Sequence, residues 1–115
     1  MKTKKITCSQ GGNFLYLGVR VIAIKTLRDF WKKHADAEQP LRAWYAEAKA
    51  ADWDKPSDIV KLYRTASILV NNRVVFNIKG NDYRLVVAIN YGYKVVYIRF
   101  VGTHKEYDKI NAEKI

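Results

Sequence analysis

Three short apolar runs in the second half of the chain are rich in β-branched and aromatic residues, which is typical of strands. They are RVVFNI (73–78), YRLVVAI (83–89) and KVVYIRF (94–100). KGND connects the first two and NYGY the last two, and the pairs Gly80–Asn81 and Tyr91–Gly92 are typical of hairpin turns. The pattern therefore predicts an antiparallel meander.

The first half of the chain combines one β-branched run with helical spacing. VRVIAI (19–24) predicts a buried strand, and Thr26 is a candidate cap for the helix that follows it. Apolar and aromatic residues then recur three and four positions apart, as on one face of a helix. These positions are Leu27, Phe30, Trp31 and His34.

Two further helices are predicted before the meander. Asp36 is a candidate cap for the second, in which Leu41, Trp44, Tyr45 and Ala48 repeat the helical spacing. Pro56 marks the start of a short third helix, because proline is favoured in the first turn. The order of these elements predicts an α+β fold. We expect a small antiparallel sheet of about four strands, two to three helices inserted after the first strand, and a short C-terminal helix.

Length and composition indicate one domain. The chain has 115 residues, of which 49% are hydrophobic, enough for a core. We expect this domain to occupy residues 19–115 and residues 1–18 to be an N-terminal extension. The apolar run that follows the basic N-terminus is interrupted by Arg20 and is too short to span a membrane.

Charge favours an anionic partner. The formal net charge is +10, from 21 lysines and arginines against 11 acidic residues, so nucleic acid, an acidic protein or a membrane surface could be bound. The sole cysteine, Cys8, cannot form an internal disulfide, which fits a reducing cytoplasm. Neither Cys8 nor the two histidines have metal-ligand spacing, so no metal and no cofactor are expected.

Two arginines interrupt the apolar strands. Alternation places Arg84 opposite Tyr83 and Leu85, and it places Arg99 on the face of Tyr97. Val96, Ile98 and Phe100 should then point the other way. A buried arginine is costly unless it is paired or solvated. The pattern favours one positively charged face shared by the two arginines over side chains that each extend to a strand edge.

The segment after the last strand, THKEYDKI (103–110), combines a helix start with reactive side chains. Thr103 and Glu106 have capping-box spacing, and His104 and Tyr107 would share one side of the helix. RNA carries its own nucleophile, the 2′-hydroxyl. Cleaving it requires one proton to be taken, one to be given and the phosphorane charge to be stabilised, which histidine, tyrosine, lysine and arginine can do without a metal.

VVFNIKGNDYRLVVAINY and KVVYIRFVGTHKEYDKI resemble the HigB-type toxins of type II toxin–antitoxin systems, within the RelE superfamily. The similarity covers about residues 19–111 and leaves 1–18 outside. The residues that match the typical pattern are Phe76, Asn77, Ile78, Gly80, Asn81, Tyr83, Arg84, Leu85, Thr103, His104, Lys105, Tyr107 and Asp108.

The resemblance implies a RelE-like sheet flanked by helices and an endoribonuclease that cleaves messenger RNA, commonly on translating ribosomes, to stop growth. It also implies a helix-turn-helix antitoxin (HigA-like), with operator DNA bound only through the toxin–antitoxin complex, and no membrane partner. The motif match assigns Arg84, His104 and Tyr107 to catalysis and Lys105 to RNA binding. The strand pattern adds Arg99 to catalysis and Lys79 to RNA binding. His104 and Tyr107 are alternative bases or acids.

Three other interpretations fit the same sequence. A non-catalytic module could bind nucleic acid through its cations and stack bases on its aromatic side chains. A degenerate toxin would keep the motifs without the activity. A scaffold could use its positive charge only to bind a protein partner.

Overall fold

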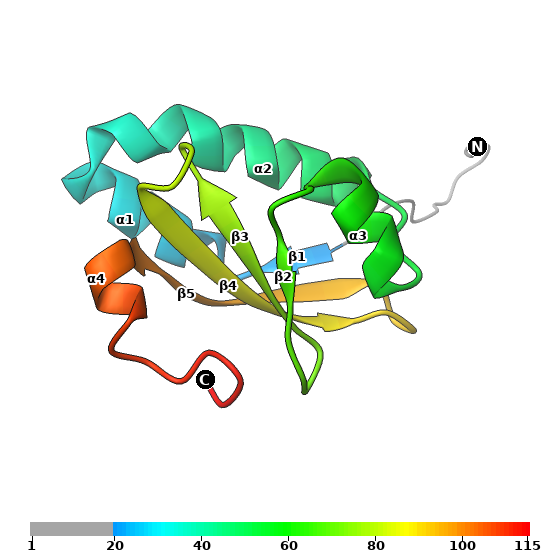
Figure 1. Ribbon diagram of the computed structural model, residues 1–115. Coiled ribbons are helices and arrows are strands. Elements are labelled where there is room, and N and C mark those ends of the chain that lie inside the picture. Colours follow the sequence, from blue (N-terminus) through cyan, green and yellow to red (C-terminus); the bar gives the residue numbers. More distant parts are fainter. Residues whose placement is uncertain (1–19) are drawn as a thin grey trace.

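The computed structural model describes residues 20–115. The predicted extension (1–18), Cys8 and the first residue of the predicted opening strand lie outside the described residues. Helices cover one face of a twisted sheet, and a short helix and the C-terminal segment lie against its other face (Figure 1). This arrangement confirms the predicted α+β class.

Within the described residues the sheet has five strands, one more than the approximate prediction, in the order β1-β5-β4-β3-β2. The last three strands form the predicted meander, whereas β1 pairs with β5 in parallel, so the sheet is mixed rather than wholly antiparallel. β2 joins the edge through a turn in which Asn71 and Asn72 adopt φ values of 60° and 59°. The strands are β1 (Arg20–Ile22), β2 (Ser67–Ile68), β3 (Arg73–Ile78), β4 (Tyr83–Asn90) and β5 (Val95–Thr103).

Two of the predicted helix caps, Thr26 and Asp36, do not cap a helix. The first begins at Ile24, directly after Ala23 in the left-handed region (φ 78°), so the opening strand is shorter than predicted and Thr26 is not a cap. Asp36 lies in a one-turn 3₁₀ helix and caps nothing. Pro56 starts its helix as predicted. The helices are α1 (Ile24–Lys33), η1 (Ala35–Ala37), α2 (Glu38–Ala50), α3 (Pro56–Leu62) and α4 (His104–Tyr107).

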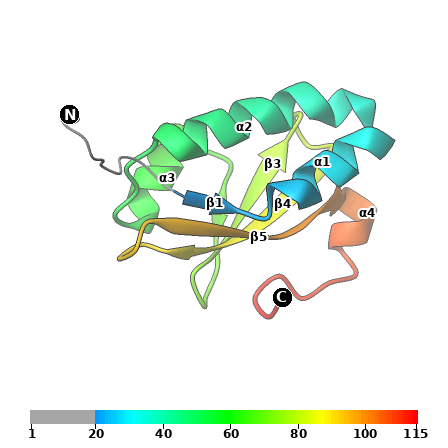
Figure 2. The ribbon, with the colours of Figure 1, turned by 180° about the vertical axis from the view of Figure 1, so that it is seen from behind.

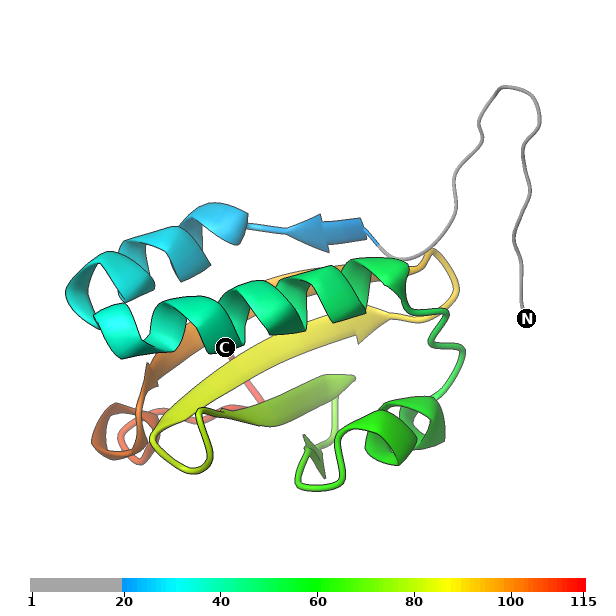
Figure 3. The same ribbon diagram turned by 90° about the horizontal axis from the view of Figure 1, so that it is seen from above.

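The main core lies between the sheet and the pair α1 and α2, which Figure 3 shows lying over the strands. The alternating residues of β4 that were predicted to share a face, Tyr83 and Leu85 among them, belong to this core. Trp44 of α2 meets Phe76 of β3 edge-on, with ring centres 5.4 Å apart. The helical spacing of the first half and the alternation of the second half therefore bury their apolar residues against each other.

The C-terminal segment covers the middle of the other face. Val75 and Val86 are buried there under Ala112, with Ile110 and Ile115 packed beside them. Arg73 Nε donates a hydrogen bond to the main-chain carbonyl oxygen of Ile115 over 2.9 Å. Seen from behind, this segment runs below β4 and β5, next to α4 (Figure 2).

A β-bulge in β5 changes which side chains share this second face. Val86 pairs with Phe100 and Val87 pairs with Ile98, so Arg99 is an extra residue. Phe100 consequently packs beside Val86, and the prediction that it shares a face with Ile98 is wrong. An inserted residue shifts the alternation of side chains by one position, which simple alternation cannot reveal.

Candidate active site

The candidate site lies where β4 passes the start of α4, at one end of the second face. Arg84 is the buried charged residue of the described chain, with 9% of its surface exposed. Its Nη1 donates to the carbonyl oxygen of Asn81 over 3.0 Å, and its Nη2 lies 3.1 Å from Nδ1 of His104. The guanidinium is thus held on one side by a turn carbonyl and by a histidine 20 residues further along the chain.

The contact between Arg84 and His104 fixes the proton position on a neutral imidazole. A guanidinium can only donate hydrogen bonds, so Nδ1 of His104 must be the acceptor. The ring proton then sits on Nε2, which lies 3.5 Å from Oδ2 of Asp108. His104 is therefore held from both sides, and it remains more than half exposed.

Tyr107 completes the cluster. The Cζ atom of Arg84 lies 6.0 Å from the centre of the Tyr107 ring, at the outer limit of a cation–π contact. The ring also packs on the apolar cluster around Val86, which holds it beside the arginine. Three residues predicted for catalysis are thus brought together by β4 and α4.

The capping box predicted from Thr103 and Glu106 is present and sets the position of α4. Thr103 Oγ1 accepts from the main-chain nitrogen of Glu106, and Oε1 of Glu106 accepts from that of Thr103 over 2.8 Å. The helix is only four residues long, so this cap largely determines where His104 points.

Gly102 leaves room at the site for the ends of two neighbouring side chains, a feature that the sequence reasoning missed. It pairs with Arg84 across the strands. A β-carbon at position 102 would lie 2.5 Å from Cζ of Phe100 and 2.8 Å from Oε1 of Glu106. The signal that could have found it is a glycine inside an otherwise β-branched strand, which often marks a close approach of another group.

The two lysines predicted to bind RNA occupy different environments. Lys105 is exposed on α4 between His104 and Tyr107, and within residues 20–115 it forms no ion pair. Lys79 lies in the turn between β3 and β4, where its Nζ is 2.9 Å from Asp82 and 3.2 Å from Asp36. Hydrogen bonds to these two carboxylates raise the pKa of Lys79. Its positive charge is therefore already matched, and its role in RNA binding stays a prediction.

Arg99 does not join the cluster. Its Cζ lies 5.5 Å from the centre of the Tyr97 ring, and no contact joins it to Arg84. Tyr97 and Arg99 line a polar hollow of about 440 Å³ next to the turn between β4 and β5, away from α4. A direct catalytic role for Arg99 stays a prediction.

The cluster supplies the groups that charge stabilisation and proton transfer need. Arg84 has five N–H groups. The one on Nε and one of the two on Nη2 have no partner among the described residues and can face an anion. Between residues 20 and 115, no group of three His, Cys, Asp or Glu side chains could hold a metal ion. None of the described helices is long and apolar enough to cross a bilayer.

Comparison with known proteins defines the class first. Residues 37–110 match the family profile of a RelE-like toxic component of a toxin–antitoxin system. The match spans well over half of the chain and contains Arg84, His104 and Tyr107. The chain therefore belongs to the HigB toxin family, whose members have an antitoxin as their counterpart.

Curated relatives carry a more specific name. The mRNA interferase toxin HigB of Escherichia coli (strain K12) is 28% identical to this chain over 96 residues, which cover 82% of this chain and 92% of the relative. The mRNA interferases HigB of Escherichia coli O157:H7 and of Shigella flexneri match to the same extent. The resemblance seen in the sequence motifs is thereby confirmed.

Proposed function

We propose that this chain is an endoribonuclease that cleaves messenger RNA on translating ribosomes and so arrests growth until its antitoxin binds. The observation that carries the proposal is the contact of Arg84 with His104 and Tyr107, in a member of the HigB toxin family. The mRNA interferase names of its relatives support the same substrate.

The proposed reaction uses the RNA's own 2′-hydroxyl. This oxygen attacks the adjacent phosphorus, the bond to the 5′-oxygen breaks, and the products are a 2′,3′-cyclic phosphate and a 5′-hydroxyl. Arg84 stabilises the extra negative charge of the phosphorane through its free N–H groups. His104 and Tyr107 divide the two proton transfers, one accepting the proton of the 2′-hydroxyl and the other protonating the leaving oxygen.

The cations around the cluster hold the RNA strand in this proposal. Lys105 binds a phosphate next to the scissile bond, since it is exposed and free of carboxylates within the described residues. Arg99, stacked on Tyr97, binds the strand further along the same face. The antitoxin is a helix-turn-helix protein (HigA-like), and operator DNA is bound only through the complex with it. Residues 1–18 remain an N-terminal extension of this toxin domain in the proposal.

The test is made in cells without the antitoxin. The chain is induced beside Arg84→Ala and a matched control, Arg28→Ala, which removes an exposed arginine of α1. New 5′ ends on messenger RNA are mapped while translation is followed. We expect cuts within translated regions from the wild type and from Arg28→Ala, and none from a folded Arg84→Ala.

Two results would contradict the proposal. Intact messages in cells that contain folded wild-type protein would leave a binding module or a degenerate toxin. Cuts that persist in Arg84→Ala would keep the nuclease but remove Arg84 from its site. Repeating the assay on purified messenger RNA with and without ribosomes tests the requirement for translation, because ribosome-dependent cleavage should be absent from naked RNA.

A further inference from the structure

A groove between α3 and β2, far from the candidate active site, is lined by apolar side chains and edged by cations. We propose that it is the docking site for an acidic segment of a protein partner that carries apolar side chains. This inference rests on the proposed function, because it assigns that segment to the antitoxin. The antitoxin would bind at this groove through an acidic segment with apolar side chains.

Apolar exposure is concentrated at this place. Six large hydrophobic side chains of the described chain are exposed, and four of them belong to α3, to β2 or to the turn after β2. They are Val60, Leu62, Ile68 and Val70. Exposed apolar side chains that gather in one place, rather than scattering singly, mark an interaction site.

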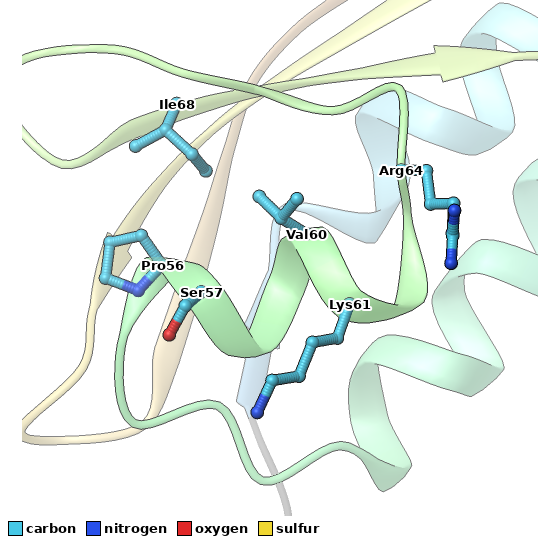
Figure 4. A pocket seen from close by; sticks show the side chains of 6 residues that line it. All are labelled: Pro56, Ser57, Val60, Lys61, Arg64 and Ile68. Atoms are coloured by element: carbon cyan, nitrogen blue, oxygen red, sulfur yellow. The ribbon is translucent and has the colours of Figure 1, made fainter.

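Two of these four side chains, Val60 and Ile68, line a groove, whereas Leu62 and Val70 lie outside its lining. Val60 of α3 and Ile68 of β2 point toward each other, and Pro56 lies at one end of the gap (Figure 4). The hollow has a volume of about 750 Å³. A groove of this size accommodates a few apolar side chains of a bound segment.

The free edge of the sheet borders the groove. Among residues 20–115, β2 is the last strand at this edge of the sheet and pairs with β3 alone. Unpaired main-chain groups along such an edge are a template for an added strand from another chain. An extended segment could therefore pair with β2 while alternate side chains enter the gap between Val60 and Ile68.

Charge determines which segment fits. Lys61 and Arg64 also belong to the lining, although their charged ends extend away from the gap between Val60 and Ile68 (Figure 4), and within the described residues neither forms an ion pair. The acidic residue of α3, Asp58, is engaged elsewhere, since it accepts a hydrogen bond from the main-chain nitrogen of Asp54 over 3.0 Å. In a chain with a net charge of +10, these cations favour an acidic partner.

The lining favours a protein segment over nucleic acid. The groove wall is made by proline, valine and isoleucine together with serine, lysine and arginine, and this described lining contains no aromatic ring. Single-stranded nucleic acid is held by stacking its bases on aromatic side chains as well as by cations. Apolar side chains that bury against Val60 and Ile68 are the better match.

The position of the groove separates its function from cleavage. α3 lies at one end of the molecule, whereas α4 with His104 lies at the other, as two views at right angles agree (Figures 1 and 3). A segment bound at α3 would leave Arg84 and its neighbours uncovered. Substitutions in the groove should therefore weaken antitoxin binding without reducing cleavage.

The test uses the full chain carrying Lys61→Glu and Arg64→Glu, with full-length antitoxin as the probe. The control, Arg28→Glu with Lys33→Glu, makes the same change of charge on exposed residues of α1. Circular dichroism verifies that both are folded. We expect the groove variant to bind antitoxin at least about tenfold more weakly, and the control to bind within about twofold of wild type.

Two further measurements test the apolar and acidic parts of the inference. Val60→Thr keeps the shape of the side chain but places a hydroxyl in the groove, and it should also weaken binding. Overlapping peptides that cover the antitoxin should identify a net acidic segment with apolar residues, and the groove variant should lose this peptide selectively.

The outcomes separate the inference from the proposed function. Antitoxin binding of the groove variant equal to that of wild type, or a bound peptide that is basic, overturns the docking site while cleavage by wild type still stands. Loss of ribosome binding instead of antitoxin binding also overturns it. If wild type does not cleave RNA yet binds antitoxin through this groove, the proposed reaction fails and the docking site stands.

Discussion

Single residues in this site are distinguished by what already pairs with them. Arg84 is buried and keeps two N–H groups free among the described residues, whereas Lys79 is bound by two carboxylates. Lys105 has no such carboxylate in the described chain and stands next to His104. The same residue type, lysine, is thus available to a phosphate at one position and occupied at the other.

This difference predicts unequal effects of two matched substitutions on RNA binding. Lys105→Ala should make the slope of log K against log salt less negative by about 0.7, the contribution of one phosphate contact on a single strand. Lys79→Ala removes the same charge, but in the wild type that charge is paired with Asp36 and Asp82 rather than with RNA. The substitution should therefore change the slope little. Titration of labelled single-stranded RNA at several salt concentrations measures both. Equal losses would mean that Lys79 leaves its carboxylates to bind RNA.

The elements at the site depend on one close approach. Where β5 turns into α4 next to Arg84, position 102 has no side chain, and a β-carbon there would have to displace the Phe100 ring and the capping carboxylate of Glu106. The capping box was predictable from its four-residue spacing. The need for glycine was not, because it arises from contacts that the fold creates.

Gly102→Ala should therefore disturb the junction between β5 and α4, and with it the site. We expect the free energy of unfolding to fall by about 1–3 kcal/mol, the usual cost of overpacking, and the cap of α4 to loosen. Chemical denaturation measures the first effect, and amide exchange at Glu106 measures the second. Gly92→Ala is the matched control, since its β-carbon would have only an ordinary contact at 3.5 Å with Asn90. Normal protection of Glu106 in Gly102→Ala would contradict this account.

Across the whole molecule, the features that follow from a regular spacing of apolar residues were predictable from the sequence. The features that break this spacing or leave no trace in it were not. Alternation in β4 and helical spacing around Trp44 correctly identified the main core. The bulge at Arg99 changed the face of Phe100, and β1 joined β5 in parallel, because neither feature leaves a periodic signal. The cluster of Arg84, His104 and Tyr107 came from motif similarity, since its members are joined only by tertiary structure.

Acid should destabilise the whole molecule through carboxylates that are paired when it is folded. A hydrogen bond from Lys25 lowers the pKa of Asp29, and a hydrogen bond from the Tyr83 hydroxyl lowers that of Asp36, both from an ordinary value of 3.8. A main-chain hydrogen bond from Asp54 does the same for Asp58. Below the ordinary value the unfolded chain binds more protons than the folded one, so stability should fall as the pH falls from about 4 through the lowered folded values.

The link between Asp36 and Tyr83 tests this at one place, because it joins η1 to β4. Tyr83→Phe removes the hydroxyl without changing the charge, so the pKa of Asp36 should return toward its ordinary value. Thermal unfolding of this variant should then lose less stability between pH 7 and pH 3 than wild type does, from a lower starting value at pH 7. Asp36→Asn should show the same shallower dependence. A dependence as steep as that of wild type in both variants would place the acid sensitivity in the other carboxylates.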